Sequence, residues 1–524
     1  MSFLRTLQKN RTLWITLAAL LVLFVSALRG MPAKDWVVTL LRGLSVGAVT
    51  FLVASGFSLI FGLLDVLNLA HGTLFMIGAY IGWTVYIRPD TFVDLLTPAA
   101  LILCGFVLLP LWELLLSRMG ALRRVERIWP WVGLLLGVLL VLWAGRRYPV
   151  TAWDVAQYEK SPVTYGFLAD QGQRLLPEPQ PFSGSPAPVL AGLLAGGMLL
   201  ALSVAGLARG RRAAAEGEIV SGRRWPWMAI VTASALLVLG LLAFAFNTPL
   251  TQFLFGLDTT WLFLITVIIA TLSGAALGAL MESTLVRPLY VRPIYQLMLT
   301  LGLSAIGIEV VRTLWGRPEF VMPKPSLFTG SGEGCPAQSL ADWFSKHCAT
   351  INILGGRVRV YNEILLPLVG VLVLVAVWLL LQRSRLGMII RAGVQDREMV
   401  EALGINVRRV FTLVFSLGVG LAALGGALAA PSTGLSNGMG EHFLLNALIA
   451  LAIGGLTSYP GAAVGSLLVG LLEQFIIKYG QIGIQLPFME APFKPTPPLV
   501  PASTVLLMVV ILLILPQGLF GRKE

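Results

Sequence analysis

Long uninterrupted apolar runs constrain the fold of this chain more than any other feature. Runs such as 259–281, 363–382 and 408–430 contain few or no charged side chains. Each is about 20 residues long, the length that a helix needs to cross a hydrocarbon core roughly 30 Å thick. The runs are continuous rather than alternating, which excludes a transmembrane β-barrel. The sequence therefore predicts an all-α fold, a polytopic transmembrane helical bundle.

Such runs recur along the whole chain, and 56% of the residues are hydrophobic, too many for a soluble protein of this length. We expect about 12–14 membrane segments, of which 66–87 and 441–457 are short or glycine-rich enough to be re-entrant. The expected segments are 12–28, 37–60, 66–87, 95–117, 129–146, 188–208, 226–246, 259–281, 296–314, 363–382, 408–430, 441–457, 461–478 and 502–516.

The formal charge of +12 comes mainly from arginines in short loops between the apolar runs. Basic residues favour loops on the cytosolic side of a membrane. With the N-terminus in the cytosol and every segment crossing, all the basic loops and the C-terminal end lie on the cytosolic side. This distribution indicates a multi-pass membrane protein and not a nucleic-acid-binding one.

The sequence lacks the common machinery for using nucleotides and metals. A P-loop requires a glycine immediately before its lysine, and no lysine in the chain follows a glycine. The chain has no HExxH motif, and its cysteines and histidines have no zinc-site spacing. We therefore expect no catalytic residues, no metal site and no cofactor in this chain, so any ATP that drives it must be bound by another chain.

A few charged side chains interrupt the apolar runs. Glu309 and Arg312 are three residues apart and therefore share a helix face, where they can form an intramembrane ion pair. Glu473 lies within a run and fits either a contact with another helix or subunit, or a proton relay.

A polar stretch flanked by glycines, FGLLDVLNLAHGTLFMIGAY, interrupts the second apolar region at 61–80. A broken helix of this kind places backbone groups where a solute can contact them. Asp65, Asn68, His71 and Gly72 are therefore candidates for a translocation path. The alternative interpretation is an ordinary cytosolic turn.

The three cysteines fall in two different settings. Cys104 lies inside an apolar run and is expected to be a packing residue. Cys335 and Cys348 share a long polar loop that the charge distribution places outside the cell. They can form a disulfide there or remain two free thiols.

The polar segment RAGVQDREMVEALGINVRR at 391–409 is expected to contain a short helix over Gln395–Leu403. Acidic residues near its start suit the helix dipole, and Gly404 is a typical stop. Its mixed charge favours insertion into a groove on a cytosolic partner over attraction to anionic lipid.

Six stretches in order carry a resemblance to a known family. The stretches are NLAHGTLFMIGAY, VRPLYVRP, LTLGLSAIGIEVVRTLWG, RLGMIIRAGVQDREMVEALGINVRRV, AIGGLTSYPGAAVGSLLVGLLE and LPQGLFGR. Over roughly 37–90 and 258–522 the chain resembles the permease subunits of branched-chain amino acid ABC importers. The similar urea and short-amide permeases share most of these motifs.

The resemblance implies import of amino acids across a bacterial inner membrane, with ATP and Mg bound by partner subunits. The implied partners are a second related permease subunit, two cytosolic ATPase subunits and a periplasmic solute-binding protein. The segment matching the family's coupling helix lies at 391–404, within the cytosolic stretch 383–409. The residues assigned to ATPase coupling are Arg391, Asp396, Met399, Glu401, Leu403 and Gly404.

Two regions depart from the family pattern. An extra span occupies 1–36, and an insertion with about four membrane segments occupies 91–257, between permease core parts at 37–90 and 258–524. The remaining alternatives for function are a permease for urea or short amides and an autonomous proton-coupled transporter or channel. A membrane-embedded enzyme is disfavoured because no catalytic constellation is visible.

Overall fold

The computed structural model describes most of the chain. The described residues are 15–16, 18, 20–22, 31–118, 125–150, 182, 184–215, 226–290, 292–316, 319–484 and 492–521. The expected first span at 12–28 thus lies largely outside the described residues. The chain forms two compact units, one comprising Met1–Tyr86, Val155–Gln173 and Asp258–Glu524, the other Ile87–Asp154 and Arg174–Leu257.

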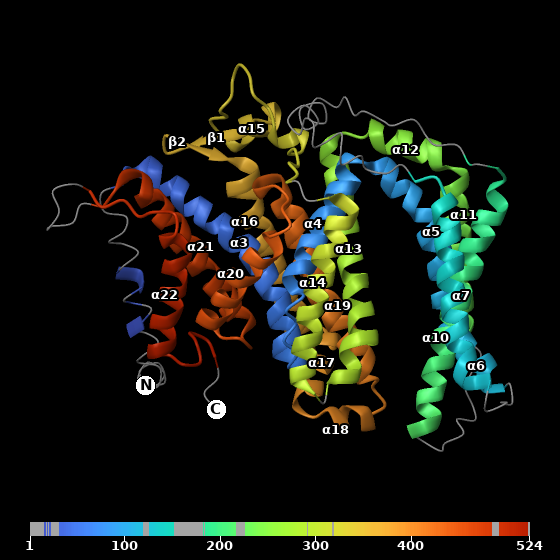
Figure 1. The fold of residues 1–524 in the computed structure, drawn as a ribbon. Helices are drawn as coiled ribbons and strands as arrows, with labels where there is room; N and C mark the ends of the chain where they lie inside the picture. The colour runs from blue at the N-terminus through green and yellow to red at the C-terminus, as the bar shows by residue number, and fades with distance from the viewer. Residues whose placement is uncertain are drawn as a thin grey trace. The chain divides into compact units, whose positions relative to one another are not determined.

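The first unit is a helical bundle built around two buried helices. Its helices are α3 (Ala33–Leu64), α4 (His71–Ile87), α13 (Thr259–Met281), α14 (Pro293–Trp315), α16 (Leu366–Arg383), α17 (Arg385–Gln395), α18 (Arg397–Ala402), α19 (Val407–Thr433), α20 (Met439–Gly454), α21 (Tyr459–Ile482) and α22 (Leu499–Ile514). α3 packs against α16, α19, α20 and α21, and α13 packs along α19 (Figure 1). α3 has 32 residues, about 48 Å at 1.5 Å per residue, so it exceeds the thickness of a bilayer core.

Glycines let the backbones of these helices touch. A Cβ added at Gly56 of α3 would collide with the carbonyl oxygen of Gly418 in α19. One at Gly72 of α4 would collide with the carbonyl oxygen of Gly440 in α20. Helices in lipid associate largely through such close backbone approach, so these small residues fix the spacing of the bundle.

The helical-bundle prediction is confirmed. Among the described residues ten helices are long and apolar enough to cross a membrane, and α20 and α22 are shorter apolar helices. The expected segment 259–281 coincides with α13. The expected segment 66–87 begins later, because residues 66–69 are not helical and α4 starts at His71.

A small polar cap at one end of the first unit is the main non-helical element. Strands β1 (Thr350–Ile353) and β2 (Gly356–Arg359) form an antiparallel hairpin beside the short helix α15 (Leu340–Lys346), and the π-helix η4 (Val360–Leu365) leads into α16. Leu354 and Gly355 both have positive φ, which suits a two-residue hairpin turn. Figure 1 shows this cap and α18 at opposite ends of the unit.

The second unit consists of helices α5 (Pro89–Val107), α6 (Leu109–Arg118), α7 (Val125–Arg147), α10 (Pro186–Ala215), α11 (Trp227–Ala245) and α12 (Asn247–Gly256). The expected segment 95–117 is interrupted at Leu108, because Pro110 lacks the N–H that would continue the helix. α12 has no counterpart among the expected segments. Cys104 is buried as expected, and its thiol lies 3.3 Å from the carbonyl oxygen of Ala233.

Candidate functional site

The polar segment after α16 forms three consecutive helices, which we call the elbow: α17, α18 and the first turns of α19. Each helix begins at a residue whose side chain accepts a hydrogen bond from a backbone N–H. Ser384 Oγ accepts from Gly387 at 2.9 Å, Asp396 Oδ1 from Met399 at 2.9 Å, and Asn406 Oδ1 from Arg409 at 3.2 Å. Such N-caps stabilise a helix by about 1 kcal/mol each.

The structure corrects the start of the predicted helix at Gln395–Leu403. α17 continues to Gln395, and Asp396 is extended because it caps the next helix, so α18 begins at Arg397. The helix ends as predicted, since Gly404 follows with a φ of +82° that favours glycine.

Among the large apolar side chains at α18, Val400 faces inward, whereas Met399 and the C-terminal capping residue Leu403 face outward. Val400 is 4% exposed and packs in a cluster with Val407 and Phe411. Met399 and Leu403 are 63% and 71% exposed. The apolar side chains of this segment are therefore divided between an anchor in the bundle and an exposed outer surface.

The remaining residues assigned to coupling also lie on the elbow. Arg391 is exposed and its guanidinium donates to Gln382 Oε1 at 2.6 Å. Glu401 and Gly404 line a shallow hollow of about 380 Å³ together with the start of α19. The elbow thus presents charged, apolar and concave features on one short segment.

A buried carboxylate, that of Glu282, holds the first turns of α19 in the elbow. Glu282 is fully buried and accepts from Arg287 Nε at 3.0 Å and Nη2 at 2.6 Å, from Tyr290 Oη at 2.8 Å and from Thr412 Oγ1 at 2.7 Å. Thr412 belongs to α19, whereas Glu282 follows α13 directly. We call this set the Glu282 clamp. It ties α13 to α19 just beyond α18.

The elbow contacts the polar break between α3 and α4. Leu64, the last residue of α3, packs against the cluster of Val400, Val407 and Phe411. It also packs against the cluster that contains Val66 and Ala70 of the break. Leu64 therefore connects α18 and the break through continuous side-chain packing.

The candidate path residues in the break are mostly enclosed. Asp65 is exposed, ends α3 with a φ of +54° and donates its N–H to Phe61 O at 2.9 Å. Asn68 and His71 are buried, and the His71 ring contacts Val53 O through Nε2 at 3.1 Å. Gly72 lies against Gly440. Their role in a translocation path stays a prediction.

The break also contacts α14. The N–H of Leu69 donates to Thr300 Oγ1 at 3.2 Å, and the hydroxyls of Thr73 and Ser304 are 2.6 Å apart. The first bond satisfies a backbone N–H of the irregular segment between α3 and α4, as buried polar groups require, and the second joins the start of α4 to α14.

The opposite end of the bundle contains a polar cavity of about 240 Å³, which we call the Glu363 cavity. Its charged lining residues are Arg42 of α3, Arg359 of β2, Glu363 of η4 and Glu473 of α21. Apolar lining comes from residues such as Val46, Val49, Leu366, Ala429 and Phe443. The sequence predicted only Glu473 among these residues.

Glu363 organises one wall of this cavity. Its buried carboxylate accepts from Arg42 Nε at 2.9 Å, from Arg359 Nε at 3.4 Å and from the Arg359 backbone N–H at 2.7 Å. Just outside the lining, burial lowers the pKa of Lys324, with the positive charge of Arg359 adding to the effect and Glu363 opposing it. The wall is therefore rich in positive charge.

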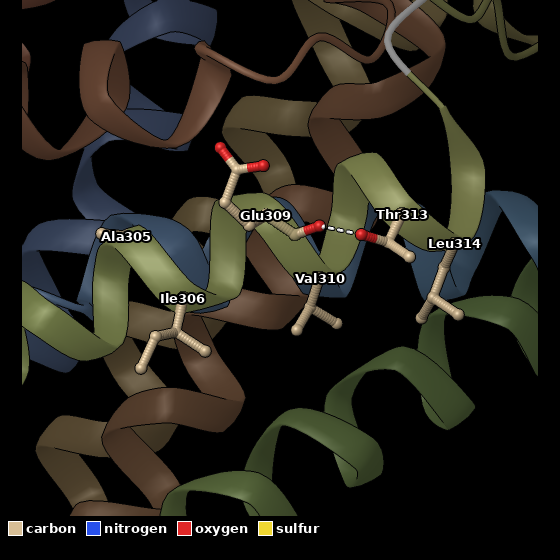
Figure 2. Close-up of a pocket in the computed structure, with 6 residues that line it drawn as sticks. All are labelled: Ala305, Ile306, Glu309, Val310, Thr313 and Leu314. Carbon is tan, nitrogen blue, oxygen red and sulfur yellow. Dashed lines mark hydrogen bonds between the residues drawn. The ribbon is translucent and has the colours of Figure 1, made fainter.

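The predicted pair on α14 lies on an exposed helix face. Arg312 Nη1 and Glu309 Oε1 are 2.6 Å apart, with the Glu309 side chain 65% exposed. A shallow hollow of about 520 Å³ runs along this face, lined by Ala305, Ile306, Glu309, Val310, Thr313 and Leu314. Figure 2 shows the Glu309 carboxylate pointing away from Ile306, Val310 and Leu314, so the hollow is apolar.

Cys335 and Cys348 are joined by a disulfide in the cap, with their Cα atoms 5.7 Å apart. In the described part of the chain, no group of three or more His, Cys, Asp or Glu side chains could hold a metal ion.

Sequence motifs did not identify the Glu363 cavity, because its lining residues come from seven separate elements. Arg42 and Glu363 are 321 residues apart in the sequence. The available local signal was the acid at the start of an apolar run, in VYNEILLPLVG. A charge at that position is costly unless it is paired.

The comparisons with known proteins point to one family. A family model described as "Branched-chain amino acid transport system / permease component" matches residues 228–515. The high-affinity branched-chain amino acid transport system permease protein LivH of Salmonella typhimurium is 27% identical over 272 residues, covering 51% of this chain and 78% of the relative. No solved structure is significantly similar to the chain.

Other relatives agree with this match. LivH of Escherichia coli K12 is 26% identical over 51% of this chain and 78% of its own length. The permease protein BraD of Pseudomonas aeruginosa is 34% identical over 33% of this chain and 51% of its own length. With more than half of its residues matched by the family model, and with a bundle of apolar helices, this chain belongs to the family of permease components of branched-chain amino acid transport systems.

Proposed function

We propose that this chain is the membrane subunit of an ATP-driven importer that moves branched-chain or similar amino acids across a bacterial inner membrane. ATP and Mg are bound by two cytosolic ATPase subunits. A second related permease completes the pore, and a periplasmic binding protein delivers the solute. Both termini and the elbow lie in the cytosol, as the basic loops favour.

The elbow is the observation that carries this proposal. α18 exposes Met399 and Leu403 to the surface while Val400 anchors it in the bundle. Exposed apolar side chains on a short helix suit insertion into a groove of a partner. Because Leu64 contacts both the anchor cluster and the break, movement of α18 would be passed to the break between α3 and α4.

The relatives support an amino acid as cargo, since the relatives named above are branched-chain amino acid permeases. A shorter match to the fructose import permease protein FruF of Bifidobacterium longum, 28% identical over 120 residues, indicates that similar chains carry other solutes. Urea or short amides remain the alternative cargo.

We also propose a division of labour along the chain. Residues 37–90 and 258–524 form the permease core, and 91–257 form an additional membrane module. Supporting this division, the elbow, the break and the Glu363 cavity all belong to the first compact unit.

The test uses the full chain purified with its second permease and ATPase subunits. We expect the double change Met399→Asp and Leu403→Asp to release the ATPase subunits and to abolish ATP-driven leucine uptake in proteoliposomes. Leu340→Asp is the matched control, because Leu340 is 66% exposed and lies in the cap. It should leave the ATPase subunits bound.

Two outcomes would overturn the proposal. One is a double variant that still binds the ATPase subunits and couples hydrolysis to uptake. The other is leucine uptake by this chain alone in liposomes carrying a proton gradient, which would establish an autonomous transporter.

A further inference from the structure

The Glu363 cavity is lined by charged side chains of both signs, which lie on different walls. Arg42 and Arg359 supply two positive charges, and Glu363 and Glu473 supply two negative ones when ionised. Glu363 holds both arginines, so this wall has a net positive charge. Glu473 on the α21 wall provides the compensating negative charge.

Glu473 is the unsatisfied member of this set. Its Oε2 atom is buried and has no hydrogen-bond partner within the described part of the chain. An ionised carboxylate oxygen that is shielded from water without a donor is costly, so such an atom is expected to receive one from a ligand or another molecule. Glu473 therefore marks a place for a cationic donor.

The arginines keep donors for a ligand. The bonds from Arg42 and Arg359 to the Glu363 carboxylate use Nε in each case, and both side chains are roughly half exposed, at 41% and 46%. A guanidinium offers five N–H donors in a planar fork that matches a carboxylate. This wall can therefore accept an anionic group while Glu363 holds the arginines in place.

The rest of the lining limits the size and polarity of the ligand. The volume of about 240 Å³ lies below the roughly 300–1,000 Å³ of pockets that take drug-sized molecules. Val46, Val49 and Phe443 give part of the wall an apolar surface. A small molecule with one positive group, one negative group and a short hydrocarbon side chain fits these features.

We infer that the Glu363 cavity is a binding site for a zwitterionic aliphatic amino acid, with its carboxylate at Arg42 and Arg359 and its ammonium at Glu473. This inference rests on the proposed function and adds the location and the polarity of a solute site. It implies that the permease itself recognises both charged groups of its cargo.

The test measures binding to the full chain in lipid nanodiscs with three probes of similar shape. L-leucine carries both charges, 4-methylpentanoate lacks the ammonium, and 3-methylbutylamine lacks the carboxylate. We expect L-leucine to bind more tightly than either analogue. Isothermal titration or ligand-observed NMR can measure weak affinities of this kind.

Two variants separate the two ends of the ligand. Glu473→Gln should weaken L-leucine and 3-methylbutylamine by about tenfold or more, the scale of one charge-assisted hydrogen bond, and leave 4-methylpentanoate unchanged. Arg42→Gln should show the reverse pattern for the two analogues. Glu333→Gln and Arg357→Gln, at exposed positions in the cap region, serve as matched controls.

Equal losses for all three probes, or no loss in either variant, would overturn the inference. A different outcome tests the proposed function. If ATP-driven leucine uptake persists at wild-type KM in both variants, the cavity assignment is wrong and the importer assignment stands. If the ATPase subunits do not bind the elbow, the importer assignment fails whatever the cavity binds.

Discussion

Two buried glutamates lie at opposite ends of the first unit and have the same kind of partner. Glu282, near the elbow, and Glu363, near the cap, are each fully buried, and each accepts hydrogen bonds from arginine. The Glu282 clamp is closed, because Arg287, Tyr290 and Thr412 occupy the carboxylate. Glu363 instead holds two half-exposed arginines beside a cavity.

The difference separates a structural charge from a binding charge. A closed clamp neutralises itself and serves to join α13 to α19. An open cluster uses one carboxylate to position two guanidiniums that still have donors to offer. Burial and pairing alone do not distinguish these roles, whereas an adjoining cavity does.

The largest expected effect on stability comes from removing the charge of Glu282. Glu282→Gln removes the charge that compensates Arg287 and should lower the free energy of unfolding by about 3 kcal/mol, allowing for the partial exposure of Arg287. Thermal unfolding in detergent would measure this loss. Thr412→Val removes a hydroxyl that donates to Glu282 and accepts from Arg287 but leaves the charge pair in place, so it should cost less, about 1.5–2 kcal/mol. Equal costs for the two variants would contradict the assignment of a charge clamp.

In the cap, at the other end of the first unit, the disulfide between Cys335 and Cys348 should stabilise the fold. Removing it with Cys335→Ser and Cys348→Ser frees a loop with a sequence separation of 13 residues, which should cost about 2–3 kcal/mol. Hydrogen exchange should increase in β1, β2 and α15 and stay unchanged in the elbow. Increased exchange in the elbow would show that the two ends are not independent.

Removing the charge of Glu363 should cost less stability than removing the charge of Glu282. Both arginine partners are roughly half exposed, so water can solvate them when Glu363→Gln removes the charge. We expect a loss of about 1 kcal/mol in thermal unfolding, together with a rise in KM for uptake of about tenfold. A loss of stability as large as that of Glu282→Gln would make Glu363 a structural residue.

The smallest effect concerns Lys324, whose pKa is lowered by burial and by Arg359. Because its folded pKa lies below the unfolded one, the charged lysine destabilises the fold at neutral pH. That penalty is relieved as the pH rises through the lowered pKa. Lys324→Met should therefore stabilise the chain by up to about 0.5 kcal/mol at pH 7, with the gain shrinking at higher pH. A gain that grows with pH would contradict this sign.

Local sequence signals were sufficient for much of the bundle. The apolar run 259–281 coincides with α13 because a membrane helix must satisfy its backbone within one continuous segment. The stop at Gly404 was also predictable, since glycine tolerates positive φ. The start of α18 was misplaced because Asp396 favours capping over a helical conformation.

The charged sites depended on long-range contacts that no local pattern encodes. Glu309 and Arg312 could be paired from spacing alone, because they are three residues apart on one helix. The Glu363 cavity could not, since Arg42 approaches Glu363 only after α3 has packed against η4. Likewise, nothing near Val400 in the sequence identifies Leu64 as its link to the break.

The placement of the cysteines makes this chain well suited to thiol spectroscopy. Cys335 and Cys348 are bonded to each other, and Cys104 is 3% exposed. Native thiols are therefore shielded from water-soluble maleimides without mutation. A single cysteine introduced at Met399 would be labelled selectively, and a fluorophore there could report the motion of α18 while ATP is hydrolysed.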